Sequence, residues 1–249
     1  MSTNKLQLND TKTEAMIALS NRMSIHTSLL SVIHIGDADV PFVSSVKNLG
    51  VTLDSNLSMS QHKKNTCKTA YIQIRHISSI RYLLTTPATQ TLVGSLVLSR
   101  LDHCTSLLSG CPQYLPDKLQ TVQNAAARLV CKAKKSNHVQ PILKSVHWLP
   151  VTHRIQYKIS SICFNSLSGK FRQYLSDLIQ PDTPTRNSRS ASYTHTFVIP
   201  RVNTKLFGER LFSYTGPSVW NNLPRSVRHS DSSSSFKTAL KNHLFQNCL

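Results

Sequence analysis

The sequence predicts an α+β chain that is mainly helical, with a small antiparallel sheet followed by a helical bundle and a mixed C-terminal region. Three observations lead to this prediction. Short runs of β-branched residues bounded by turn residues lie before residue 58. Apolar residues then recur at helical spacing as far as about residue 167. After Gln180 the chain becomes rich in Ser, Thr, Pro and Arg, which is typical of an exposed connection.

The first expected elements are strands. They are Ser31–Ile35, Val40–Val43 and Val46–Leu53, separated by Gly36-Asp37 and by Ser44-Ser45. Because Gly, Asp and Ser favour turns between alternating runs, these segments predict a small antiparallel sheet. Residues near Lys12 to Ile17 alternate poorly and are expected to finish a helix.

Five helices are expected to follow. They are Met59–Leu84, Pro87–Leu108, about Pro116–Lys132, Ile142–His147 and Val151–Leu167. Asp54 or Ser58 can cap the first of them, and Pro87 suits the first turn of the second. The inward face of the third is expected to consist of Leu119, Val122, Ala126 and Leu129.

The C-terminal region is expected to be mixed. Pro181–Thr196 and Ser230–Ser235 predict flexible connections, because they offer few apolar side chains to bury. Short strands are expected around Gly208 and Gly216, and a short amphipathic helix at Phe236–Phe245. The predicted divisions are therefore 1–58, 59–135, 136–180, 181–196 and 197–249.

The charge is strongly uneven. The formal net charge is +18, yet Met1–Ser60 carries four Lys or Arg against five Asp or Glu, whereas Gln61 onward carries 25 against six. Such a basic field attracts phosphate backbones through counterion release. Composition alone leaves open the alternative that the positive charge affects only solubility and non-specific adhesion.

Other features narrow the class of protein. The N-terminus is polar and no run of eighteen apolar residues occurs, so we expect neither a membrane span nor a secretory signal, and an intracellular protein of the nucleus or the cytoplasm. The six cysteines include no C-x-x-C pair, which predicts reduced and mostly buried thiols. No P-loop, dinucleotide fingerprint or G-x-S-x-G elbow is present.

Several separated strings carry a family resemblance. They are SRLDHCTSLLSGCPQYLPDKLQTVQNAAARLV at Ser99–Val130, VHWLPVTHRI at Val146–Ile155, GPSVWNNLP at Gly216–Pro224, FKTALKNHLF at Phe236–Phe245, and upstream NKLQLNDTKTEAM at Asn4–Met16 and VKNLGVTLD at Val46–Asp54. In this order and spacing they resemble the region after the catalytic core of reverse transcriptases from non-LTR (LINE-type) retrotransposons. The chain departs from the usual pattern at His103 and Thr105, where the family has Tyr and Asn.

The resemblance implies that residues 1–58 are the edge of a polymerase palm and that the following helices are a thumb. In the family, the turn of a hairpin called the primer grip presses on the end of the growing strand, and the resemblance makes Leu49 and Gly50 the primer-grip-like residues. Polymerases of this kind hold two catalytic metals on aspartates, one pair within an aromatic-x-Asp-Asp hairpin. No Asp-Asp pair occurs in this sequence. The expectation is therefore a non-catalytic fragment of an RNA-directed DNA polymerase that is not an enzyme.

The expected partner is the backbone of a template–primer, RNA or DNA. Cations and an amide on the third helix and after it are the candidate contacts, namely Lys118, Gln123, Arg128, Lys132, Lys134 and Lys135. Long cationic side chains and amides can bind phosphates without reading sequence. The competing interpretation of these residues is a solvated helix face.

No cofactor or metal is expected. Cys104 and Cys111 are seven residues apart, whereas zinc ligands usually come in close pairs. Trp148 and Trp220 could stack on bases but are expected to be core anchors. Two alternatives to the nucleic-acid binder stay open from the sequence, a relic whose basic surface has no role and a domesticated structural or interaction module.

Overall fold

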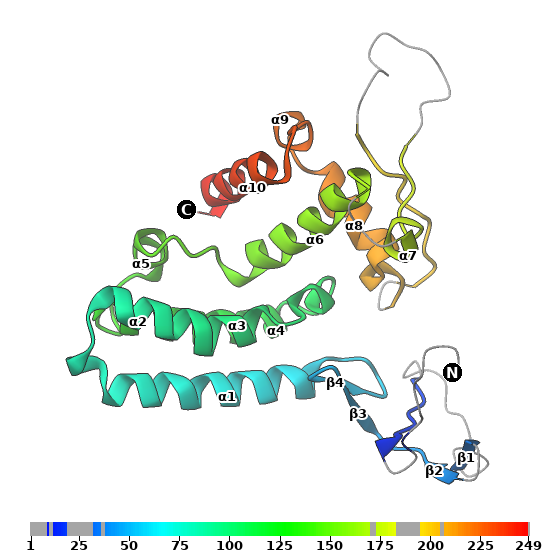
Figure 1. Ribbon diagram of the computed structural model, residues 1–249, viewed down its shortest axis with the longest axis horizontal. Coiled ribbons are helices and arrows are strands. Elements are labelled where there is room, and N and C mark those ends of the chain that lie inside the picture. The colour runs from blue at the N-terminus through cyan, green and yellow to red at the C-terminus, as the bar shows by residue number, and fades with distance from the viewer. Residues whose placement is uncertain are drawn as a thin grey trace. The chain divides into compact units, whose positions relative to one another are not determined.

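The computed structural model describes residues 9, 12–18, 32–35, 38–169, 173–182, 195–204 and 207–248 (Figure 1). The chain separates into two compact units, Met1–Thr66 and Cys67–Leu249, and each is described by itself. The described residues are mainly helical, with two small antiparallel two-stranded sheets. This confirms the predicted fold class.

The first unit contains two hairpins. Strand β1 (Val32–Ile35) pairs with β2 (Ala38–Pro41), and β3 (Ser45–Asn48) pairs with β4 (Val51–Asp54). The single strand expected at Val46–Leu53 is therefore wrong. The chain turns back at Leu49-Gly50, where both φ angles are positive, 47° and 83°. Such a pair is the signature of a tight hairpin turn whose twist matches that of the strands.

The helix expected to end near Ile17 is also absent from the described residues. Ala15 instead forms a parallel bridge with Phe42, and the Val43 N–H donates to the Ala15 carbonyl at 2.8 Å. An extended backbone here satisfies the polar groups beside β2, which a helix would not.

Helix α1 (Ser60–Ser79) begins where the sequence predicted a cap. The Asp54 carboxylate accepts from the Ser58 N–H at 2.8 Å, and the Ser58 hydroxyl accepts from the Ser60 N–H at 3.2 Å. The helix ends before the predicted Leu84. The chain continues as a 3₁₀ turn, η4 (Arg81–Leu83), because the buried Arg81 side chain is held by backbone carbonyls.

The second expected helix, Pro87–Leu108, is broken into four pieces. They are α2 (Thr86–Val93), the π-helical turn η5 (Gly94–Leu98), α3 (Ser99–Asp102) and the 3₁₀ turn η6 (Thr105–Leu108). The Thr85 side chain caps α2 by accepting from the Ala88 N–H at 3.3 Å, and Pro87 lies in the first turn as predicted. The π turn begins at Gly94, a poor helix former, and Cys104, with a positive φ of 53°, separates α3 from η6.

The third and fifth predicted helices are confirmed. Helix α4 (Tyr114–Cys131) buries Leu115, Leu119, Val122, Ala126 and Val130 along one face. Helix α6 (Val151–Leu167) has the predicted bounds, and it packs against α4, α8 and α10 as the central helix of the second unit (Figure 1). Between them lies α5 (Val139–Ser145), three residues earlier than expected.

The C-terminal region is helical where strands were expected. Around Gly208 and Gly216 the chain forms the 3₁₀ turn η7 (Gly208–Arg210) and the helix α8 (Phe212–Asn221). A Cβ atom at Gly216 would lie 3.3 Å from the Cys163 Sγ of α6. Glycine therefore permits the close approach of α8 to α6, and this packing outweighs its low helix propensity.

The last elements are α7 (Gln173–Ser176), α9 (Arg225–Arg228) and α10 (Ser233–Cys248). Helix α10 is longer than the predicted Phe236–Phe245 and begins inside the serine run that was expected to be flexible. The Ser232 hydroxyl accepts from the Ser235 N–H at 3.1 Å, so these serines cap a helix. Most of the predicted linker, residues 183–194, lies outside the described residues.

An aromatic cluster joins α6, α8 and α10. The rings of Phe164 and Phe236 stack with centroids 4.3 Å apart, and Trp220 lies 5.7 Å from Phe236 and 5.9 Å from Phe197. Trp220 is 0% exposed and Trp148 is also buried, which confirms both as core anchors.

The six cysteines are free, as predicted, but only Cys163 is buried. The expectation of mostly buried thiols was therefore wrong, because the other five lie at half-exposed positions. Burial raises the pKa of the Cys163 thiol to about 12, so this thiol stays protonated at neutral pH.

Candidate nucleic-acid interface

The second unit carries almost the entire basic excess of the chain. Cys67–Leu249 contains 23 Lys or Arg and six Asp or Glu. The stretch from Lys118 to Ser176 contains ten Lys or Arg and no Asp or Glu. The cations of this stretch have no acidic partner within it, so its local charge is strongly positive and attracts anions.

The end of α4 gathers three of the predicted contacts. Lys132, Lys134 and Lys135 are exposed, and none of their side chains forms a hydrogen bond or ion pair with any residue that the structure describes. We call these three residues the basic corner. Their ammonium groups are presented to solvent within four positions of one another, which is the arrangement that phosphate contacts require.

Backbone contacts fix the shape of the basic corner. Lys132 ends α4 in the left-handed conformation, with φ of 51°, and the Ala133 N–H donates to the Arg128 carbonyl at 3.0 Å. The Asn137 N–H donates to the Lys134 carbonyl at 3.1 Å. The corner is therefore a closed turn rather than an extended loop.

Arg128 supports this turn. Its Nη2 donates to the Asn137 carbonyl at 3.2 Å, and its Nε is buried without a partner among the described residues. The half-buried guanidinium thus holds the loop after α4 against the helix. Its predicted role as a phosphate contact stays a prediction, while the structure gives it a positioning role.

The predicted role of Gln123 as a nucleic-acid contact is wrong. This residue was expected to face solvent beside the basic residues, but it is 0% exposed and its Nε2 donates to the Leu149 carbonyl at 2.8 Å. It lies one helical turn after Leu119 and so shares the inward face of α4. The amide ties α4 to the segment before α6 and cannot reach a nucleic acid.

Lys118 is exposed, as expected, but the structure does not bring it to the basic corner. Fourteen residues of α4 separate it from Lys132, or about 21 Å along the axis at 1.5 Å per residue. Leu49 and Gly50 form the β3–β4 turn in the other unit, where the Leu49 side chain is 86% exposed at the tip.

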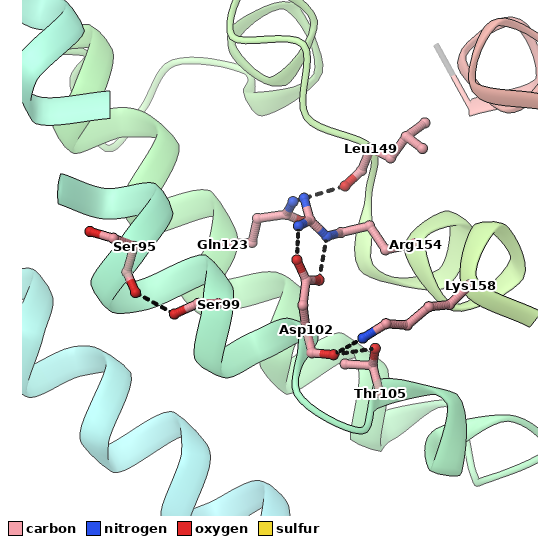
Figure 2. A network of polar contacts seen from close by, with 8 residues as sticks. All are labelled: Ser95, Ser99, Asp102, Thr105, Gln123, Leu149, Arg154 and Lys158. Carbon is pink, nitrogen blue, oxygen red and sulfur yellow. Dashed lines mark hydrogen bonds and ion pairs between the residues drawn. The ribbon is translucent and has the colours of Figure 1, made fainter. Parts of the chain in front are cut away.

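One polar network was missed by the sequence analysis (Figure 2). The Asp102 carboxylate at the end of α3 accepts from the Nε of Arg154 at 2.7 Å and also from its Nη2. The Asp102 carbonyl accepts from Lys158 Nζ and from the Thr105 hydroxyl. Arg154 and Lys158 are more than fifty residues from Asp102, so no local spacing could have indicated these contacts.

The described ranges hold neither a metal-binding cluster nor a membrane-spanning helix. No group of three or more His, Cys, Asp or Glu side chains comes together there in a way that could hold a metal ion. No helix in those ranges is both long and apolar enough to cross a lipid bilayer.

Comparison of this chain with known protein families, with curated proteins and with solved structures finds no match.

Proposed function

We propose that this chain binds the sugar–phosphate backbone of nucleic acid through the basic corner, as a thumb-like part of a non-LTR retrotransposon reverse transcriptase. The observation that supports this most is the exposure of three lysines, without acidic partners among the described residues, on a closed turn at the end of α4. The acid-free stretch around them adds to the same field. The proposed role is binding rather than catalysis, since the sequence holds no Asp-Asp pair.

A structural role for the same lysines is the main competitor. Cations at a helix C-terminus offset the macrodipole by about 0.3–1 kcal/mol each at exposed positions. This role needs no nucleic acid. The two roles differ in the salt dependence of binding, because neutralised phosphates release counterions.

The test replaces Lys132, Lys134 and Lys135 together by Ala and measures affinity for a short primer–template duplex at several salt concentrations. With a slope of about −0.9 per phosphate neutralised, the triple variant should flatten the plot of log affinity against log salt by two to three units. The change should depend little on nucleotide sequence, because backbone contacts carry no base information.

The matched control replaces three scattered exposed lysines, Lys64, Lys68 and Lys237, by Ala. It removes the same charge, and its slope should stay close to that of the parent. If both triple variants flatten the slope equally, the charge acts diffusely and the basic corner is no interface. That result would favour the alternative, a structural or interaction module. Thermal denaturation of each variant checks that folding is retained.

A further inference from the structure

A cavity of about 420 Å³ lies in the second unit beside the Asp102 network. Its lining comes from the end of α3, the segment before α6, α6 itself and α10, and consists of Asp102, His147, Leu149, Arg154, Tyr157, Lys158 and Lys241. The volume falls within the range of about 300–1,000 Å³ that small-ligand sites occupy. The basic corner contributes no side chain to it.

Arg154 is the best-oriented donor in this cavity. Its side chain is 22% exposed, and the Asp102 carboxylate holds it through Nε and Nη2 (Figure 2). A guanidinium carries five N–H groups, so three remain without a partner among the described residues. Because the ion pair already fixes the plane of the group, these donors are preorganised for a further anion.

Two lysines add charge to the same cavity. Lys158 Nζ uses one of its three N–H groups on the Asp102 carbonyl. Lys241 reaches over the Phe245 ring, 5.8 Å from its centroid, and makes no ion pair with the described residues. Three cations against one carboxylate leave the lining with two excess positive charges.

Tyr157 offers a neutral donor beside them. Its hydroxyl has no hydrogen-bond partner in the described part of the chain. Burial raises the pKa of Tyr157, so the hydroxyl keeps its proton at neutral pH and can donate.

We propose that this cavity binds a phosphate group through Arg154, Lys158 and Lys241. A phosphate accepts several hydrogen bonds from different directions and carries up to two negative charges, which matches this set of donors better than a planar, singly charged carboxylate does. The phosphate can belong to a small anion or to a nucleic-acid backbone, since both present the same oxygens. The proposal does not depend on the basic corner.

The test titrates the full chain with inorganic pyrophosphate by isothermal titration calorimetry at fixed ionic strength. Lys158→Gln combined with Lys241→Gln should weaken binding by at least about tenfold, because each cation supplies a charge-assisted hydrogen bond. The control combines Lys144→Gln with Lys237→Gln, two exposed lysines outside the cavity. It removes the same charge and should change the affinity by less than about twofold.

Competition with a short duplex separates the two sources of phosphate. If the duplex displaces pyrophosphate from the parent, the cavity takes a backbone phosphate; if it does not, the cavity takes a small anion. Either result supports the site. Absence of pyrophosphate binding, or equal weakening in the two double variants, would overturn it. The basic-corner triple variant should bind pyrophosphate like the parent, so failure of one proposal is distinguishable from failure of the other.

Discussion

Replacing Trp220 with Ala is expected to lower the free energy of unfolding by about 3–5 kcal/mol, the range for truncating a buried aromatic side chain. The ring is fully buried between Phe197 and Phe236, so its loss leaves a cavity that α6, α8 and α10 cannot easily close. Its Nε1 also donates to the His195 carbonyl at 2.6 Å. Urea denaturation followed by far-ultraviolet circular dichroism measures the effect, because most helices lie in the second unit.

A conservative variant and an exposed control test this expectation further. Trp220→Phe keeps an aromatic ring beside Phe236 but removes the indole donor, and we expect a smaller loss of about 1–2 kcal/mol. Tyr174→Ala on α7 truncates an exposed ring and should change stability by no more than about 0.5 kcal/mol. A loss below 1 kcal/mol for Trp220→Ala would show that the aromatic cluster does not hold the C-terminal helices as described.

Replacing Arg81 with Met is expected to cost about 2–4 kcal/mol, since each buried acceptor left unsatisfied costs about 1–3 kcal/mol. Arg81 is 7% exposed. Its Nε donates to the Leu129 carbonyl at 3.0 Å and its Nη2 to the Val130 carbonyl at 2.9 Å. These carbonyls belong to the last turn of α4, where the helix has no N–H donors of its own to satisfy them.

The same contacts give Arg81 a second consequence. It fixes the end of α4 immediately before Lys132, so its loss should also loosen the basic corner. The matched control is Arg75→Met, which removes an identical side chain from an exposed position of α1 and should cost no more than about 0.5 kcal/mol. Equal losses for the two variants in urea denaturation would contradict the assigned role.

The long helices were predictable because the spacing of apolar residues and the residues that start or stop helices pointed to the same bounds. In α6 the apolar residues Val151, Ile155 and Ile159 recur every four positions, and Pro150 precedes the first turn. The same spacing places Gln123 on the inward face of α4, because it lies four residues after Leu119. Its polarity led to the wrong expectation, because an amide can be buried when a carbonyl pairs with it.

The C-terminal helices were not predictable from local pattern. The segment around Gly216 combines aromatics, Gly and Pro, which favour strands and turns over a helix. Its helical state depends on packing against Cys163 of α6, a contact that sequence periodicity does not contain. The turn at Leu49 was missed by the local pattern, which predicted one strand where the resemblance implied a hairpin, since a leucine with positive φ carries no turn signal.

The cavity and its ion pair depend on contacts between distant segments. Asp102 and Arg154 come from helices that touch only in the folded chain. What the sequence does contain is the run of 59 residues, 118–176, without a carboxylate, and this run includes both Arg154 and Lys158. Such a run indicates an anion-binding surface without indicating its geometry.

Lysine footprinting tests the central claim most directly. The chain is acetylated briefly with and without a primer–template duplex, and the modification of each lysine is read by mass spectrometry. We expect the duplex to protect Lys132, Lys134 and Lys135, while the exposed Lys68 and Lys237 react unchanged. High salt should abolish the protection, because it weakens phosphate contacts. Binding of the duplex with these three lysines as reactive as in the free chain would contradict the assignment of the basic corner to nucleic acid.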